Sequence, residues 1–243
     1  METTMKMNEG RKRKRVCIED EPSSNVNKLP TEMVVDILAN VAADSFDAFF
    51  SAKQCCKFFV RASEDDFIYK RLTLNVLPDK LWWTPKKAKA LVRRCISCGN
   101  AEALYWQGLF EFFSTLNLDE GINLIREAAR EGDVGALYIL GVIYVCSDDA
   151  QLKRGGGEIL KKVHREGKVS ECREKFQRVI ESMWMNNRSI FRKKPSYACP
   201  MRAEHWKDGL WRSNALVRDG VHCEACIFQA DSMFLYIHCP PAM

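Results

Sequence analysis

The sequence lacks the short motifs that would assign an enzymatic activity. It has no glycine-rich phosphate-binding loop, no Gly-x-Gly-x-x-Gly dinucleotide motif and no nucleophile turn. Its four histidines lie late in the chain apart from His164, and no local signature supports a Cys–His nucleophile. Because no catalytic constellation is present, we expect a protein that is not an enzyme.

Long apolar runs are also missing. The best candidate, residues 134–146, is shorter than a membrane-spanning helix and contains Gly135 and Gly141. The first ten residues are polar and charged, without the apolar core of a secretory signal. We therefore expect no membrane association and a location in the nucleus and/or cytoplasm. The 11 cysteines should then be reduced thiols that act as small hydrophobes or metal ligands.

Excess charge is confined to one short run. The net charge is only +5, which leaves the rest of the chain close to neutral and argues against a protein that binds nucleic acid over its whole surface. Residues 1–27 are too polar to form a core, so we expect a disordered basic tail. It contains five consecutive cations: Arg11, Lys12, Arg13, Lys14 and Arg15. This run is either a nuclear-import signal or a solvated tail.

The most informative stretch runs from Leu29 to Leu72. Pro30 suits the first turn of a helix, where no backbone N–H is needed. Apolar residues then recur at helical spacing, namely Met33, Val34, Ile37, Leu38 and Val41. A second helical pattern follows the polar break at residues 43–45. Two short helices with this much apolar surface cannot bury all of it against each other, so the stretch predicts a docking module.

These residues resemble the F-box family, in a variant typical of a plant subgroup. The resemblance rests on Leu29-Pro30-x-Glu32, on Ile37-Leu38 and on the Cys56-Lys57-x-Phe59 ending. Phe59 stands where the family usually has Trp, and residues 41–45 replace its second Leu-Pro. The resemblance implies binding to a Skp-type adaptor of a cullin ubiquitin ligase. The residues that it places at the adaptor are Leu29, Pro30, Ile37, Leu38, Cys56, Lys57 and Phe59.

An internal repeat follows the F-box-like stretch. Ala103-Leu104-Tyr105-x-x-Gly108 recurs 33 residues later as Ala136-Leu137-Tyr138-x-x-Gly141. A period near 34 residues is that of helix-pair solenoids, and the pattern resembles Sel-like and tetratricopeptide repeats. Gly108 and Gly141 fall within helices, which indicates close approach of a paired helix. These repeats either bind a partner on a concave surface or act as a structural spacer.

The repeat period predicts helices and the loops between them. The expected helices are 86–98, 101–114, 119–131, 134–146, 156–166 and 169–187. Glycines at the ends of these helices are expected to take the left-handed conformation that terminates a helix. Residues 147–157 contain three consecutive glycines and are expected to form a mobile loop. Two adjacent tryptophans, Trp82 and Trp83, are expected to attach the preceding linker to the core.

The C-terminal segment changes character. Cys223-x-x-Cys226 is a spacing that brings two thiolates to one metal ion, and Cys199 with His238 or Cys239 would complete a zinc site. The candidate ligand set is therefore Cys199, Cys223, Cys226 and Cys239. The alternative is a loosely ordered tail with free thiols and no cofactor.

The predicted fold is all-α, with an F-box helical unit followed by a short α-solenoid of helix pairs and an irregular C-terminal tail. The expected division is 1–27 basic tail, 28–76 F-box, 77–187 repeats and 188–243 Cys/His tail. The resemblance implies a substrate-recruiting F-box subunit, in which the repeats bind an unknown target protein. Two alternatives are a ligase-independent repeat scaffold with a degenerate F-box and a zinc-dependent nuclear nucleic-acid binder.

Overall fold

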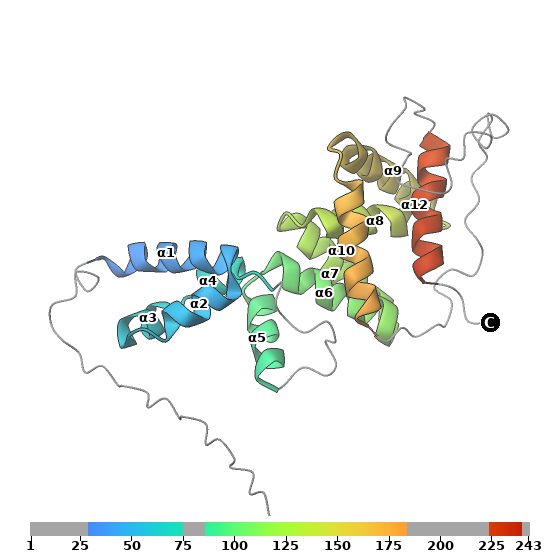
Figure 1. Ribbon diagram of the computed structural model, residues 1–243. Coiled ribbons are helices and arrows are strands. Elements are labelled where there is room, and N and C mark those ends of the chain that lie inside the picture. The colour runs from blue at the N-terminus through green and yellow to red at the C-terminus, as the bar shows by residue number, and fades with distance from the viewer. Residues whose placement is uncertain (1–28, 75–85, 184–223, 240–243) are drawn as a thin grey trace, which may run out of the picture.

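The computed structural model describes residues 29–74, 86–183 and 224–239, and every element in these ranges is helical (Figure 1). This confirms the all-α class. Within the same ranges, no helix combines the length and apolar character needed to cross a membrane. The basic run and the two linker tryptophans lie outside the described residues, so the predictions made for them stay predictions.

The F-box-like stretch forms four short helices. They are α1 (Thr31–Asp44), α2 (Phe46–Lys53), α3 (Lys57–Ala62) and α4 (Asp66–Arg71). Ser45 ends α1 and starts α2, because its hydroxyl accepts a hydrogen bond from the backbone N–H of Ala48. The core of the unit contains buried residues from α1, α2 and α4 and from the residues after α4, including Val34, Leu38, Phe49, Ile68, Leu72 and Leu74.

The repeat region follows the predicted boundaries closely, except at the start of α9 and at the end of α10, which stops at Glu181 although a helix was expected over 169–187. Its helices are α5 (Lys86–Ser97), α6 (Ala101–Phe110), α7 (Leu118–Arg130), α8 (Val134–Val145), α9 (Ala150–Arg165) and α10 (Val169–Glu181), with a π-helical turn, η3 (Glu111–Thr115), after α6. Gly99, Gly132 and Gly167 have φ values of +74°, +98° and +68°, so each ends a helix in the left-handed conformation, as predicted.

The glycines inside the helices mark where paired helices touch. A Cβ atom on Gly108 of α6 would lie 2.7 Å from the Ile125 side chain of α7. A Cβ atom on Gly141 of α8 would lie 2.9 Å from the Ile159 side chain of α9. Both distances are shorter than real Cβ contacts, so only glycine lets the backbones approach this closely. The close approach predicted for these two positions is confirmed.

The prediction of a mobile loop over residues 147–157 is wrong, because most of this range is helical. Helix α9 begins at Ala150, after Asp149 accepts hydrogen bonds from the backbone N–H groups of Gln151 and Leu152. The three glycines lie inside this helix. Gly156 faces α8, where an added Cβ would lie 2.7 Å from the carbonyl oxygen of Gly141. Gly156 therefore allows close helix packing here rather than chain flexibility.

The C-terminal segment also departs from the expected irregular tail. Residues Glu224–His238 form a helix, α12, that packs on α8 and α9 and is seen in red beside α10 (Figure 1). Leu235 and Cys239 are buried in the core of the repeat region. The interpretation of this part of the sequence as a loose Cys/His tail overlooked its apolar residues at helical spacing.

Buried Asn100 joins the F-box unit to the repeats. Its Oδ1 accepts from the backbone N–H of Ala103 and so caps α6, at 2.9 Å. Its Nδ2 donates to the carbonyl oxygens of Tyr69 and Leu72, at 2.9 and 2.8 Å. The core of the F-box unit also includes Cys95 and Ala103 from α5 and α6. The two regions therefore share one packed interior.

The glycine pair in α9 gives a direct test of the helix. We expect Gly155→Ala to stabilise the protein by up to about 1 kcal/mol, because Gly155 lies in a helix and nothing surrounds its missing Cβ. Gly156→Ala should destabilise it, since the new methyl group would push α8 and α9 apart. Urea unfolding of the two variants measures both effects. Equal effects of the two changes would contradict the packing of α9.

The Asn100 junction predicts a larger cost than an ordinary cap. Asn100→Ala removes a cap and leaves two buried carbonyl oxygens without their donor, so unfolding should become easier by about 2–3 kcal/mol. Asn100→Asp keeps the acceptor but loses the donor, and should be at least as damaging. Ser45→Ala, which removes an exposed cap, should cost only about 1 kcal/mol. Chemical denaturation compares the three, and equal costs for Asn100→Ala and Ser45→Ala would contradict the junction.

Candidate protein-docking site

The first helix carries an exposed apolar stripe. Met33 and Ile37 are 51% and 50% exposed, and their spacing of four residues places them on one side of α1. Leu29, which is 37% exposed, lies just before the helix. Pro30 is exposed beside them. We call these four residues the α1 stripe. On the other side of the same helix, Val34, Leu38, Ala39 and Ala42 are buried in the core. Helix α1 is therefore apolar on both sides, and only one side is covered.

One residue of the predicted adaptor set is misplaced. Leu38 is 1% exposed and belongs to the core, so its side chain is not available to a partner. Met33, which the prediction left out of the set, is among the most exposed large apolar side chains of the unit. The spacing separates the two sides of the helix, because Met33 and Ile37 are four residues apart while Leu38 is offset from Ile37 by about 100°. It does not tell which side is covered.

The Cys-Lys-x-aromatic ending lies at the start of α3. Cys56 precedes the helix, and its Sγ accepts a hydrogen bond from the backbone N–H of Phe59 at 3.4 Å. Cys56 and Lys57 are exposed, whereas Phe59 is half-buried and packs against the core of the F-box unit. Cys56 therefore caps a helix in addition to lying at the surface, and Phe59 is shared between the core and the surface.

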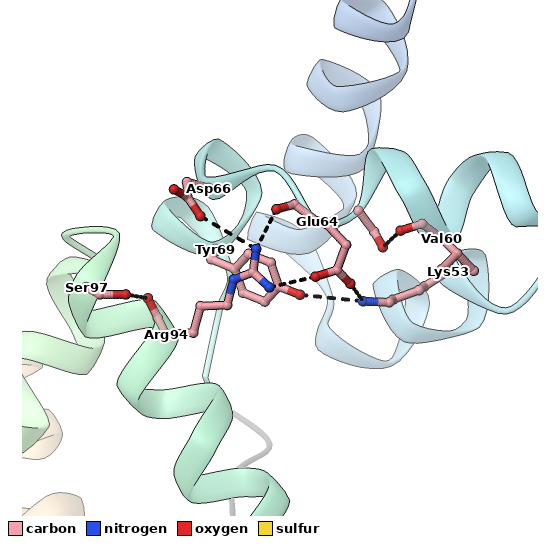
Figure 2. A network of polar contacts seen from close by, with 8 residues as sticks. Lys53, Val60, Glu64, Asp66, Tyr69, Arg94 and Ser97 are labelled. Carbon is pink, nitrogen blue, oxygen red and sulfur yellow. Dashed lines mark hydrogen bonds and ion pairs between the residues drawn. The ribbon is translucent and has the colours of Figure 1, made fainter.

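A network of polar side chains fixes the F-box unit against α5 (Figure 2). Arg94 of α5 forms an ion pair with Glu64 at 2.6 Å, and its guanidinium lies over the ring of Tyr69, 4.0 Å from the ring centre. Lys53 of α2 reaches the same carboxylate, also at 2.6 Å. The hydrogen bond from Lys53, followed by the one from Arg94, lowers the pKa of Glu64. The carboxylate therefore stays charged between two cations from separate regions.

A groove lies where the F-box unit meets the repeats. It has a volume of about 810 Å³ and is lined by residues at the end of α4, the start of α6, the α7–α8 turn and one side of α10. Ion pairs hold its walls: Lys70 of α4 contacts Glu131 at 2.6 Å, and Lys175 of α10 contacts Asp133. In its lining, Glu102 accepts a hydrogen bond from the backbone N–H of Leu74, and burial raises the pKa of this carboxyl group.

The predicted zinc ligands do not come together where they are described. Cys226 lies near the start of α12 and Cys239 directly follows its last residue, thirteen positions away. A helix rises about 1.5 Å per residue, so they are separated by roughly 20 Å and cannot bind the same ion. The alternative ligand His238 is excluded by the same distance. Cys199 and Cys223 lie outside the described residues. Within the described part of the chain, no group of three His, Cys, Asp or Glu could hold a metal ion.

Comparison with known proteins supports both halves of the fold. The family model of plant tetratricopeptide repeats matches residues 75–181. The putative F-box protein At1g67623 of Arabidopsis thaliana is 28% identical over 171 residues, which cover 68% of this chain and 57% of that protein. The F-box protein At1g67340 of the same plant is 23% identical over 244 residues, covering 96% of this chain and 61% of that protein.

A third relative from Arabidopsis thaliana, F-box protein At2g35280, is 24% identical over 123 residues, which cover 51% of this chain and 75% of that protein. The chain thus spans less than two thirds of the length of two of these three relatives. No solved structure matches the chain. The comparisons confirm the resemblance found in the sequence: the chain is similar to plant F-box proteins, and its helical repeat region matches the family model of plant tetratricopeptide repeats.

Proposed function

We propose that the protein is the substrate-recruiting F-box subunit of a Skp–cullin–F-box ubiquitin ligase. The F-box unit binds the Skp-type adaptor, and through it the cullin, while the repeats bind the target protein. The observation that carries this proposal is the α1 stripe. Two large apolar side chains on one side of α1 and a third just before the helix remain exposed, and an exposed apolar surface of this kind is typical of a protein interface.

The energetics of the stripe favour a specific partner. Burying a Leu, Ile or Met side chain contributes about 1.5–3 kcal/mol. The three half-exposed side chains of the stripe together would supply several kcal/mol, which is enough to dominate a protein interface. The helix beneath them is already fixed by its buried side. Little conformational entropy would therefore be lost when a partner binds.

The role needs no catalytic residue in this chain. A recruiting subunit acts by raising the local concentration of the target beside the transfer machinery. Such a subunit works best when its two binding regions are rigidly connected. The shared core, the Asn100 junction and the Arg94–Glu64 ion pair all connect the F-box unit to the repeats.

The groove beside α4 and α10 is the candidate surface for part of the target. Its lining carries carboxylates and cations in equal number, including Glu102, Glu171, Arg71 and Arg178. A groove with both signs of charge fits a polar segment of a target better than an apolar one. We further propose that the protein acts in the nucleus and/or cytoplasm and that the run Arg11–Arg15 is its import signal.

The α1 stripe predicts a defined loss of adaptor binding. Leu29→Ala combined with Ile37→Ala should weaken binding of a purified Skp-type adaptor by about 10–100-fold, because most of two apolar contacts is lost. Both side chains are exposed, so the melting temperature should change little. Calorimetric titration of the full chain with the adaptor measures the affinity.

The matched control is Leu152→Ala in α9, which truncates a leucine that is 41% exposed but lies in the repeats. It should leave adaptor affinity unchanged. Adaptor binding that survives the double substitution would contradict the role of the stripe. If the unaltered chain binds no Skp-type adaptor while its repeats still bind other proteins, the molecule is instead a ligase-independent scaffold.

A further inference from the structure

Helix α12 lies on the middle of the repeat array. It packs against α8 and α9 (Figure 1). Its Asp231 also contacts Arg173 of α10. A helix that simply closed the end of the array would stack on α10, the last repeat helix. Residues 184–223 connect α10 to α12. The contacts that hold α12 therefore define a surface made by three repeat helices, with a helix already bound to it.

A fully buried carboxylate anchors α12. Asp231 is 0% exposed and contacts one side chain from each of the three repeat helices. Its Oδ1 accepts from the hydroxyl group of Tyr138 at 2.8 Å and from the guanidinium of Arg173 at 2.6 Å. Its Oδ2 lies 2.8 Å from Nε2 of His164. Charge-assisted bonds of this kind fix orientation as well as contributing free energy.

The carboxylate site is organised by the repeats themselves. Arg173 also donates through Nε to the hydroxyl oxygen of Tyr138 at 3.0 Å, a bond that does not involve α12. Tyr138 belongs to the repeat motif, and its hydroxyl group is oriented by two neighbours rather than by α12 alone. Without α12, Arg173 and His164 would present donors to an otherwise apolar surface, which is a site for one carboxylate.

Aromatic side chains flank the acid on α12. Phe234 packs edge-on against Phe176 of α10 with ring centres 5.8 Å apart, and lies under the guanidinium of Arg173. Phe228 lies over Gly157, where an added Cβ would be 3.0 Å from the ring. Gly157, the third of the consecutive glycines in α9, therefore provides space for an aromatic residue of α12. The surface accepts an aromatic residue, an acid three positions later and a second aromatic after three more.

We propose that this face of α8, α9 and α10 is a docking site for a helix of the target, and that α12 is its resident occupant. The target helix would carry a carboxylate between two aromatic or large apolar residues, in the pattern of Phe228, Asp231 and Phe234. The target displaces α12 when it binds. This inference rests on the proposed role of the repeats in target recruitment, but its test does not require the adaptor.

Hydrogen exchange on the full chain tests whether α12 can leave without unfolding the array. Asp231→Ala should raise exchange in residues 226–238 at least about 10-fold while changing α6, α7 and α8 less than about twofold. Gly157→Leu should also raise exchange in α12, because the new side chain would occupy the position of the Phe228 ring. Gly155→Leu is the matched control in the same helix and should leave exchange in α12 unchanged, since nothing lies within 4 Å of its missing Cβ. Ile237→Ala, at a side chain 64% exposed, should have no effect.

A labelled peptide of residues 224–239 then tests whether the surface accepts a helix in trans. The peptide should bind the full-length Asp231→Ala protein at least about 10-fold more tightly than the unaltered protein, whose site is occupied by its own tethered helix. A peptide carrying Asp231→Ala should bind neither protein. Adding Arg173→Met to the Asp231→Ala protein should abolish binding of the unaltered peptide.

Three results would overturn the proposal. The first is loss of protection throughout the array in both Asp231→Ala and Gly157→Leu, which would make α12 an integral part of the fold. The second is equal peptide binding by the unaltered and Asp231→Ala proteins. The third is an exchange of α12 between two copies, detected as a dimer by light scattering. The affinity for a Skp-type adaptor, measured on the same Asp231→Ala protein, should be unchanged. If neither this protein nor the unaltered one binds the adaptor, only the proposed ligase role is removed.

Discussion

The hydrogen bonds of Asn100 are the constraint on which the rest of the structure depends. One side chain caps the first repeat helix that carries the Ala-Leu-Tyr-x-x-Gly motif and also satisfies two carbonyl oxygens at the end of the F-box unit. Because all three bonds are buried, breaking any of them would leave a polar group without a partner. The side chain therefore fixes both the start of α6 and the position of this helix against the F-box unit, and the Arg94–Glu64 pair holds α5 against the same unit at the surface.

This arrangement separates the surfaces proposed to bind partners. The α1 stripe belongs to the F-box unit, whereas α12 lies on a surface formed by the repeat helices α8, α9 and α10 (Figure 1). The groove lined by α4, α6 and α10 lies at the junction between them. An adaptor on α1 would therefore leave the repeats accessible. The connection is stiff because apolar packing and buried hydrogen bonds act together, so a bound target would keep a defined position relative to the adaptor.

Most of the fold could be predicted from local signals in the sequence. Gly99, Gly132 and Gly167 ended helices as expected, because a left-handed residue after a helix is a local requirement. Residues 155–157 were misassigned because three consecutive glycines usually favour a loop. The role of Gly156 depends on Gly141 of α8 and that of Gly157 on Phe228 of α12, and neither partner is adjacent in sequence. Tertiary packing outweighed local propensity at this point.

The candidate site could be predicted only in part. Helical spacing identified an apolar α1, but spacing alone does not tell which of two apolar sides is covered. The structure assigns Leu38 to the core and leaves Ile37 exposed. The Cys-x-x-Cys spacing suggested a metal knuckle, yet Cys226 lies on a helix far from Cys239. The anchor of α12 had no sequence signal, because Asp231 meets Tyr138, His164 and Arg173 only through the fold.

The central claim is that the F-box unit docks an adaptor through the exposed side of α1 while the repeats remain available. A hydrogen-exchange footprint of the full chain, measured with and without a purified Skp-type adaptor, tests it most directly. The account predicts slower exchange in residues 31–41 when the adaptor is present, with no change in α6, α8 or α10. No protection of α1, or protection located in the repeats instead, would contradict it.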